Sequence, residues 1–521
     1  MTEPSAADLL ERPSGFMPDL IRDHARRRPE RIAVMMDGRG VDYRAFDRIV
    51  DRIAASLQRD GVLPGEAVSI SAATGLRYAA LYIGVLRAGA AVAPIAPSVT
   101  GEQMAAMIAD SGARLAFLDD GTAATPGTHG DRLTAQIIAI DDGGAGLAWS
   151  DWLAGEDATP AHVDPDPDLP FNIIYSSGTT GVPKGIVHSH RMRWRQIAGT
   201  KPVGYDEAVL INSTPLYSNT TLVTFLPALA WGGTVVLMKK FEARRFLELA
   251  AEVRATHAML VPVQYARIMA EPDFGRFDLS SFRYKTCTSA PFAADLKRDV
   301  LDRWPGKLLE YYGLTEGGCS FALVADEHPD KLHTVGRPLP GHEVKLIGED
   351  GIEVAPGEAG EIVGRSGTMM DGYLGRIDKT AEMIWTDADG QRWFRQGDIG
   401  RLDEDGFLIL TDRKKDMIIS GGFNVFPSDI EAVVRTCPGV EDVSVVGVPS
   451  DRWGETPVAF VVGTADGETV MAFTNDRVGK TQRLSDVVGI EELPRSAIGK
   501  VLKRDLRDRY ATYATYATSQ A

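Results

Sequence analysis

The sequence predicts an α/β protein with a large N-terminal domain of mostly parallel sheets and a small C-terminal α/β domain. Its 521 residues, 44% of them hydrophobic, exceed what one domain usually holds. Short β-type runs alternate with amphipathic helical stretches, as in strands joined by crossover helices. A polar, charged stretch at 411–416 then interrupts the apolar pattern. We therefore expect one domain over residues 1–414 and a second over 415–521.

The first elements follow from apolar spacing. The stretch "RAFDRIVDRIAASLQRDG" (44–61) predicts an amphipathic helix, and "EAVSISA" (66–72) predicts a strand. Residues 78–96 are the most membrane-like window, but Arg87, two glycines and Pro94 break it. A buried helix followed by a strand therefore fits better than a bilayer span, and we expect no transmembrane segment.

Later elements follow from strand and turn signals. The runs at 233–238 and 257–262 predict strands, and "HVDPDPDLP" (162–170) predicts an extended linker that feeds the next strand. Asp405-Gly406 lies between two strand-like runs and predicts a hairpin. The terminal "YATYATYATSQA" reads as a frayed tail without a role.

Composition excludes several classes of function. The net charge of -16 argues against a nucleic-acid surface, which needs clustered Lys and Arg. Cys287, Cys319 and Cys437 show no metal-ligand spacing, so we expect reduced thiols and no disulfide. The acidic N-terminus is unlike a secretory signal, and we expect a cytoplasmic protein.

The stretch "YSSGTTGVPKG" (175–185) concentrates Ser, Thr, Gly and one lysine, Lys184. Glycines let backbone N–H groups approach an anion closely, and lysine adds a mobile charge, so phosphate is the natural ligand. Gly181 is followed by Val-Pro-Lys-Gly, which is not a Walker loop, and the glycine spacing is not that of a Rossmann fingerprint. A polar surface turn remains the alternative from these residues alone.

The chain resembles the adenylate-forming superfamily of acyl- and aryl-CoA ligases, luciferases and peptide-synthetase adenylation domains. The resemblance covers nearly the whole chain and rests on motifs in the family's order. They are "LRAGAAVAPIAP", "YSSGTTGVPKG", "YYGLTEGG", "WFRQGDIGRLDEDGFLILTDRKKDMIISGGFNVFPSDIE" and "ELPRSAIGKVLKRDL". The resemblance implies ATP, Mg2+ and coenzyme A as co-substrates and cofactors, and a small C-terminal domain that is mobile.

By position, the resemblance implies an ATP site. Tyr312 matches the aromatic that stacks on adenine, Thr315 the hydroxyl near the α-phosphate, and Glu316 the carboxylate that holds magnesium. Asp398 matches the acid on the ribose, with Arg413 beside it. The remaining matched positions are Ser176, Ser177, Gly178, Thr179, Thr180, Gly181 and Lys184 around the phosphates and Ser289, Ala290 and Pro291 along the adenine and acyl pocket.

Lys500, in "PRSAIGK", matches the family's catalytic lysine, which reaches the carboxylate and the α-phosphate. Read alone, it would be a solvated lysine at a helix start. Lys415 matches the hinge of the small domain, and Gly421 and Gly422 match the tunnel for the pantetheine arm. The resemblance therefore implies adenylation followed by thioester formation.

The predicted acyl pocket departs from the family pattern at Ser218 and, relative to hydroxycinnamate ligases, which often carry Gly there, at Tyr311. Ser218 stands where many relatives carry a histidine that gates the passage between the acyl and thiol pockets. We therefore do not assign a gating histidine to this chain. Gly313 stands where acetate-specific members place a tryptophan, which leaves room for a larger acid, and Tyr311 narrows one wall. The predicted lining is Tyr217, Ser218, Tyr311, Gly313, Cys319 and Ser320. A mostly apolar, medium to large acid is expected, with aryl and aliphatic acids both open.

The leading interpretation is an AMP-forming acid:CoA ligase of fatty acid or phenylpropanoid metabolism. A stand-alone adenylation enzyme that loads a carrier protein is the nearest alternative. A luciferase-like oxygenase and a noncatalytic sensor are weaker ones, and the intact lysines and carboxylates argue against the sensor. The sequence determines neither the acid nor the oligomeric state, and it is compatible with a homodimer.

Overall fold

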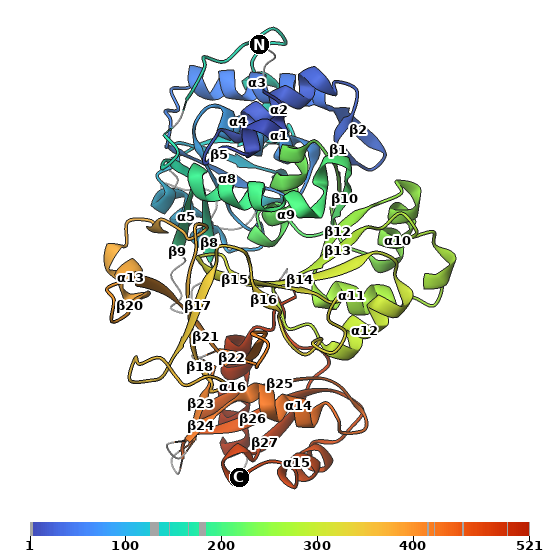
Figure 1. Cartoon of the computed structure of the whole chain (residues 1–521), viewed down its shortest axis with the longest axis vertical. Coiled ribbons are helices and arrows are strands. Elements are labelled where there is room, and N and C mark those ends of the chain that lie inside the picture. The colour runs from blue at the N-terminus through green and yellow to red at the C-terminus, as the bar shows by residue number, and fades with distance from the viewer. Residues whose placement is uncertain are drawn as a thin grey trace.

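The computed structural model describes residues 4–124, 135–144, 146–164, 166–176, 184–413, 416–420, 423–450, 453–496 and 499–519. Two large, mostly parallel sheets dominate the N-terminal part (Figure 1). The first has the order β16 (Arg337–Pro338), β15 (Gly317–Val324), β14 (Lys307–Leu314), β13 (Tyr284–Cys287), β12 (His257–Leu260), β10 (Val209–Asn212), β11 (Thr234–Leu237), β1 (Ile32–Met36), β2 (Arg39–Asp42). The second has the order β19 (Gly372–Tyr373), β9 (Lys184–Ser189), β8 (Pro170–Ser176), β4 (Ala91–Pro94), β3 (Ala67–Ser71), β5 (Leu115–Leu118), β6 (Gln136–Ala139), β7 (Leu147–Ala148).

Helices fill the space between these sheets and cover their outer faces. The inner helices are α1 (Ala6–Leu10), α2 (Met17–Arg27), α3 (Tyr43–Arg59), α4 (Leu76–Arg87), α8 (His190–Gly199) and α9 (Asn219–Trp231). The second sheet is covered outside by α5 (Gly101–Ser111), and the first by α10 (Ala243–Glu252), α11 (Pro262–Met269) and α12 (Ala294–Arg303). Short elements connect them: α6 (Asp120–Ala123), α7 (Trp149–Trp152), η1 (Lys201–Val203), η2 (Tyr205–Glu207) and η3 (Phe274–Arg276).

The inner helices differ in how much of their surface is apolar, and this difference matches how deeply each helix is buried. Helix α3 begins at the N-cap Asp42, whose side chain accepts from Ala45 N, and buries one face through Phe46, Val50 and Ile53. Helix α4 is buried on all sides because it contacts strands of both sheets. A Cβ on Gly84 would lie 2.4 Å from Ile53 Cγ2, so this glycine permits the close approach of α4 to α3.

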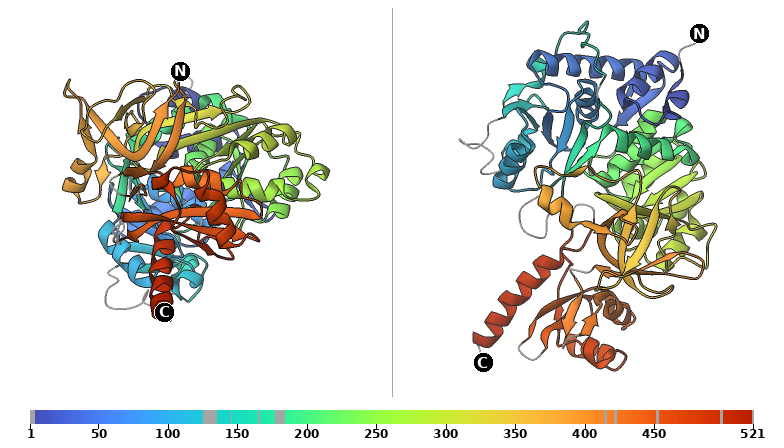
Figure 2. Two further views of the ribbon diagram at one scale, coloured as in Figure 1. Left: turned by 90° about the horizontal axis from the view of Figure 1, so that it is seen from below. Right: turned by 60° about the vertical axis from the view of Figure 1, so that its left-hand side comes forward.

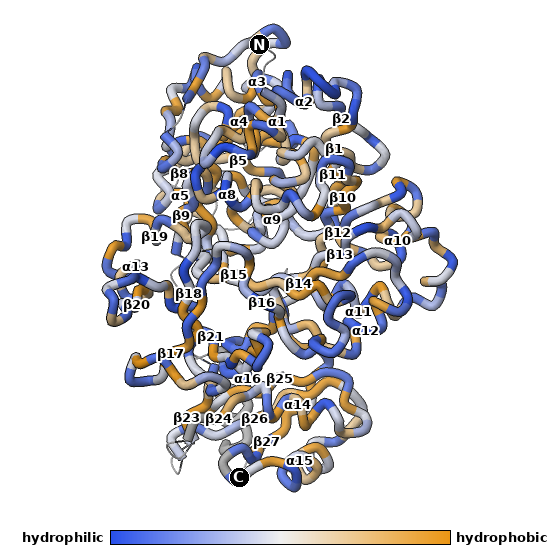
Figure 3. Tube along the Cα trace, in the orientation of Figure 1, coloured by the Kyte–Doolittle hydropathy of each residue, from blue (hydrophilic) through white to orange (hydrophobic). Residues whose placement is uncertain are grey.

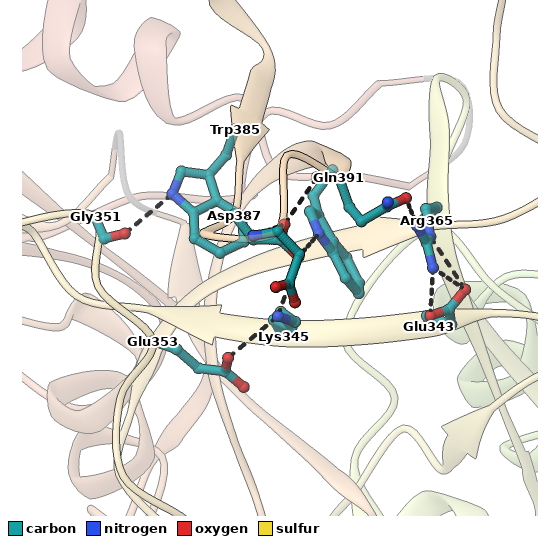
Figure 4. A network of polar contacts seen from close by, with 10 residues as sticks. Glu343, Lys345, Gly351, Glu353, Arg365, Trp385, Asp387 and Gln391 are labelled. Atoms are coloured by element: carbon teal, nitrogen blue, oxygen red, sulfur yellow. Dashed lines mark hydrogen bonds and ion pairs between the residues drawn. The ribbon is translucent and has the colours of Figure 1, made fainter.

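A third, antiparallel sheet follows and carries residues of the site. It consists of β17 (Glu343–Ile347), β18 (Gly360–Arg365), β21 (Arg392–Leu402) and β20 (Ile384–Thr386), with β22 (Leu408–Arg413) on β21, and α13 (Ile377–Glu382) precedes β20. Figure 4 shows the polar network that joins these strands. Asp387 accepts from Trp393 Nε1 at 2.9 Å and from Lys345 Nζ at 3.2 Å, and Arg365 pairs with Glu343 at 2.7 Å.

The C-terminal part has its own sheet and core. The strands are β24 (Phe423–Val425), β23 (Ile418–Ser420), β26 (Gly454–Gly463), β25 (Val440–Ser450) and β27 (Asp486–Gly489), with α14 (Pro427–Val434), α15 (Gly467–Asn475), η4 (Lys480–Gln482) and α16 (Lys503–Ser519). Figure 3 shows hydrophobic residues along α14 and β25, whose apolar side chains form this core. The proposed boundary near 415 falls beside residues 414 and 415, which lie outside the described residues.

The structure confirms the predicted fold class, the helix and strand within 78–96, and the hairpin at Asp405-Gly406. No helix in the described ranges is both long and apolar enough to cross a membrane. All three cysteines are buried as free thiols, as expected. The prediction that the C-terminal tail is frayed was wrong for its backbone, because helix α16 continues to Ser519. This helix projects from the small domain (Figure 2). The terminal repeat contains alanines and no Gly or Pro to end the helix.

Candidate active site

The candidate site lies where four parallel strands of the nine-stranded sheet end together. The register aligns Asn212 with Met259, Leu260 with Cys287, and Cys287 with Glu310, so β10, β12, β13 and β14 share one carboxyl edge. The segments 213–220, 261–263, 288–291 and 311–316 therefore meet there. In open α/β sheets, ligands bind outside the carboxyl ends of the strands.

The predicted magnesium carboxylate, Glu316, lies in the tight turn between β14 and β15. Tyr373 Oη donates to Glu316 Oε1 at 3.1 Å, and the backbone N of Met370 donates to the Glu316 carbonyl at 2.9 Å. Burial and the Glu316 carboxylate both raise the pKa of Tyr373, so its hydroxyl stays protonated and remains a donor. Tyr373 thus fixes the orientation of this carboxylate.

Lys184 starts β9 and reaches the same tyrosine. Its Nζ lies 5.1 Å from the centre of the Tyr373 ring, a cation–π distance, and Tyr373 pairs with Ile186 across β19 and β9. Lys184 and Glu316, far apart in sequence, therefore contact the ring and the hydroxyl of one side chain. Ser176 ends β8 and pairs with Lys184 through its backbone. The predicted phosphate residues Ser177, Gly178, Thr179, Thr180 and Gly181 lie outside the described residues.

The predicted adenine and ribose residues contact each other. Tyr312 Oη donates to Asp398 Oδ2 at 2.7 Å, and the Asp398 residue is 6% exposed. The Tyr312 ring packs on Phe321 with centroids 5.7 Å apart, which leaves Tyr312 anchored on one side. Asp398 is the strand partner of Arg413 across β21 and β22, so the backbone of the predicted arginine also lies beside it.

The predicted acid pocket is divided by the alternation of β15. Ser320 faces Gly313, where an added Cβ would lie 2.8 Å from Ser320 Oγ, and Tyr311 packs beside Ala322, which points to the same side as Ser320. Cys319 points to the opposite side and is fully buried, and burial raises the pKa of its thiol to about 12. The structure therefore does not bring Cys319 together with the other predicted lining residues.

Two hydroxyls link the start of α9 to the predicted adenine segment. Thr220 Oγ1 and Ser289 Oγ lie 2.6 Å apart, and Ser289 has φ of 83°, a left-handed conformation that is strained for a non-glycine residue. Ser218 caps α9 by accepting from Thr220 N at 3.3 Å, and Tyr217 before it is half-buried. Ala290 and the exposed Pro291 continue the segment toward solvent.

The Lys500 loop lies against the large domain. The loop is closed by the 2.8 Å hydrogen bonds from Ser496 N to the Lys500 carbonyl and from Arg495 Nη1 to the Gly499 carbonyl. A Cβ on Gly499 would lie 2.7 Å from Val263 Cγ1, so this glycine permits contact with the start of α11. Lys500 therefore sits at the same sheet edge as Ser289. The predicted hinge and tunnel residues Lys415, Gly421 and Gly422 lie outside the described residues.

The described residues fit a magnesium ion held largely by substrate. They contain no group of three or more His, Cys, Asp or Glu side chains that could hold a metal. A single oriented carboxylate, Glu316, is nonetheless present beside Lys184 and Tyr373. Magnesium commonly takes one or two carboxylates together with substrate phosphates, so this donor set suits it.

Sequence reasoning missed Tyr373 because it lies far along the chain from both side chains that it contacts. Its position depends on the pairing of β19 with β9, which no local pattern predicts. It also missed His188, whose Nε2 lies 2.7 Å from the Thr315 carbonyl. The only signal for His188 is a histidine placed on a strand directly after the predicted phosphate loop.

Comparison with known proteins identifies the family of this chain. The AMP-binding enzyme family matches residues 21–374, and the AMP-binding enzyme C-terminal domain matches residues 429–500. The chain is 34% identical to a feruloyl-CoA synthase of Amycolatopsis sp, covering 93% of this chain and 97% of the relative. It is 31% identical to the fatty acid–[acyl-carrier-protein] ligase ScoC of Streptomyces coeruleorubidus, covering 94% and 95%.

Among solved structures, the amide bond synthetase McbA from Marinactinospora thermotolerans superposes with a TM-score of 0.85 at 28% identity, covering 95% of this chain and 99% of that one. The two family matches together contain Lys184, Tyr312, Glu316 and Lys500, and Asp398 lies between the two matched ranges. This chain therefore belongs to the AMP-binding enzymes, the adenylate-forming superfamily that its motifs resemble.

Proposed function

We propose that this protein is an AMP-forming carboxylic acid:CoA ligase for a medium to large, mostly apolar acid. The observation that carries the proposal is the convergence of Lys184, Glu316 and the Tyr312–Asp398 pair at one sheet edge, with the Lys500 loop docked there. These groups match in kind what adenylation needs: cations for phosphates, a carboxylate for magnesium, and an acid for ribose hydroxyls.

In the first step, a carboxylate oxygen of the acid attacks the α-phosphorus of ATP. The bond from that phosphorus to the β-phosphate bridging oxygen breaks, and acyl-AMP and pyrophosphate form. Charge spreads over the phosphoryl oxygens, so catalysis rests on positioning and electrostatic stabilisation. Lys184 would neutralise the departing phosphates, and Lys500 would contact the reacting carboxylate and α-phosphate. Magnesium, held by Glu316, would supply further charge neutralisation when bound.

In the second step, a thiol that has lost its proton to solvent attacks the acyl carbonyl carbon, the bond from that carbon to the phosphate oxygen breaks, and AMP leaves with the electron pair. CoA is the proposed thiol, and the feruloyl-CoA synthase relative supports it. The ScoC relative favours a second candidate, transfer to the phosphopantetheine thiol of a carrier protein. Both candidates share the first step and differ only in the acceptor.

Gly313 and Ser320 support an acid of medium to large size. Two small residues face each other across β14 and β15 where a bulky side chain would shorten the pocket. Ser218 in place of an imidazole also leaves space at the start of α9. The proposed substrates are therefore aryl acids of the hydroxycinnamate type and medium- to long-chain fatty acids. For the protein as a whole, we also propose a cytoplasmic location and a homodimer.

The proposal is tested by pyrophosphate release with magnesium-ATP and a panel of acetate, octanoate, palmitate, benzoate, 4-coumarate and ferulate, each with and without CoA. We expect release with one acid class and conversion to AMP and acyl-CoA only when CoA is present. Accumulation of acyl-AMP with no effect of CoA would favour the carrier-protein candidate. No release with any acid would contradict the ligase.

A further inference from the structure

A buried polar network beneath the site holds a cation that no carboxylate balances. Arg193, on α8, is fully buried. Its Nε donates to Asn172 Oδ1 at 2.9 Å, its Nη1 to Gln196 Oε1 at 2.7 Å, and its Nη2 to His188 Nδ1 at 2.9 Å and Asn219 Oδ1 at 2.7 Å. All four partners are neutral groups, and within the described ranges no ion pair involves Arg193.

The histidine in this network, His188, is neutral and has one defined tautomer. Its Nδ1 accepts from Arg193 and from Asn172 Nδ2 at 3.1 Å, so the proton must sit on Nε2, which donates to the Thr315 carbonyl at 2.7 Å. Burial and the charge of Arg193 hold the pKa of His188 well below its usual range. Burial lowers the pKa of Arg193 to about 10, so the guanidinium stays charged at neutral pH.

The network joins segments that come from different parts of the fold. Asn172 and His188 are cross-strand partners on β8 and β9, and Ser176 and Lys184 are a further pair of partners along the same two strands. Asn219 is the first residue of α9, directly after the capping Ser218. Thr315 begins the turn that presents Glu316. One guanidinium and one imidazole therefore connect the proposed phosphate, acid and magnesium segments.

We infer that His188 and Arg193 are positioning residues that hold the Thr315–Glu316 turn in register with the β8–β9 hairpin and the start of α9. Neither residue is placed in contact with substrate. Their effect is transmitted through the Thr315 carbonyl and the Asn219 side chain. The inference rests on the proposed function for the identity of the ligands, but its geometry stands on the hydrogen bonds alone.

A buried group without its partner is costly, which makes the network sensitive to substitution. His188→Leu keeps similar volume but removes the acceptor of Arg193 and the donor to Thr315. His188→Gln keeps an amide donor and an acceptor in one side chain, so it can bond both neighbours. His257→Leu is a matched control, because His257 is also buried and lies 2.9 Å from a carbonyl, that of Val203, through its Nε2. It lies at the opposite end of β12 from the site.

The experiment titrates MgCl2 at fixed ATP and measures ATP binding by calorimetry in the full-length protein and the three variants. Melting temperature and the rate of pyrophosphate release with the best acid of the panel are recorded alongside. Loss of an outer partner of a metal ligand typically weakens metal binding or activity by about 10–100-fold. We expect His188→Leu to raise the MgCl2 midpoint by that factor and to lower kcat, with His188→Gln close to the unaltered protein.

His257→Leu should lower the melting temperature without moving the MgCl2 midpoint. The inference would be overturned if the MgCl2 midpoint of His188→Leu lay within about twofold of that of the unaltered protein. Such a shift is smaller than the effect of losing an outer partner of a metal ligand. Equal shifts in His188→Leu and His257→Leu, or an equal loss in His188→Gln, would also overturn it. If no acid supports pyrophosphate release but ATP binding still shows the His188 effect, the proposed function fails and the positioning role stands. Absence of ATP binding in the unaltered protein would refute both.

Discussion

Substitution of Gly313 by tryptophan tests where the acid lies. Gly313 is in β14 with a backbone that any residue can adopt, since it is not among the glycines with positive φ. An added Cβ would meet Ser320 Oγ at 2.8 Å and Ser320 Cβ at 3.4 Å, so rotation of one hydroxyl makes room for it. The indole would then project in front of β14 and β15, into the space proposed for the acyl chain.

The expected magnitude follows from the surface that the acid could no longer bury. Octanoate has six more methylene groups than acetate, and each is worth about 0.8 kcal/mol when buried. Full exclusion would therefore cost about 5 kcal/mol, or roughly 10³–10⁴-fold in kcat/KM for octanoate, with acetate unaffected. For an aryl acid, loss of ring burial of about 1.5–3 kcal/mol predicts a decrease of roughly 10–150-fold.

The assay is the kcat/KM for pyrophosphate release with acetate, octanoate and ferulate, accompanied by the Kd of ATP as a measure of an intact nucleotide site. Gly313→Ala is the control, because it introduces the same Cβ without the indole and should change kcat/KM little. If the tryptophan variant binds ATP normally and still accepts the large acid at its original kcat/KM, the acid does not lie against Gly313 and the pocket placement is refuted.

Three further predictions concern catalysis, pH and stability. Lys500→Ala should lower the rate of adenylation by about 10²–10³-fold with little change in the Kd of ATP, and an unchanged rate of pyrophosphate release would contradict its role. Although partial desolvation opposes it, the Gln391 backbone N–H, the Trp393 indole and Lys345 lower the pKa of Asp387 to about 2. This carboxylate therefore stabilises the fold above its unfolded pKa of about 4 and loses that contribution as pH falls toward 2. Asp387→Asn should accordingly lower the melting temperature at pH 6, and the gap from the unaltered protein should narrow as pH falls below about 4 and close only at or below about pH 2; a constant gap would refute the pKa assignment. Lys297 contacts Glu310 with side chains only 2% and 4% exposed, so Lys297→Met should destabilise the fold by about 3–5 kcal/mol in denaturant unfolding, and Lys297→Met/Glu310→Leu should recover most of that loss.

Local patterns predicted most of the elements correctly. The apolar spacing of 44–61 gives α3, and the interrupted run at 78–96 gives α4 and β4. The turn at Asp405-Gly406 gives the hairpin of β21 and β22. These succeed because the information lies within a few residues: periodicity, a cap, or a glycine that a turn requires. The prediction of a frayed tail was wrong because it rested on the absence of an apolar pattern, whereas the alanines of the tail continue helix α16.

The sequence by itself determined the family, the order of the site motifs and the chemical types at the site: Lys184, Tyr312, Glu316, Asp398 and Lys500. These are properties of short segments, and a short segment carries them wherever it lies. Their identity as an adenylation set follows from the motifs in order, without coordinates.

Only the tertiary structure decided which of these groups touch. Tyr373 holds Glu316 because β19 pairs with β9, and Arg193 reaches Asn219 because α8 and α9 pack side by side between the sheets. Cys319 is turned away from the acid pocket because successive residues of β15 point to opposite faces. Such contacts depend on strand register and helix packing, which are set by the burial of the whole chain rather than by any local pattern.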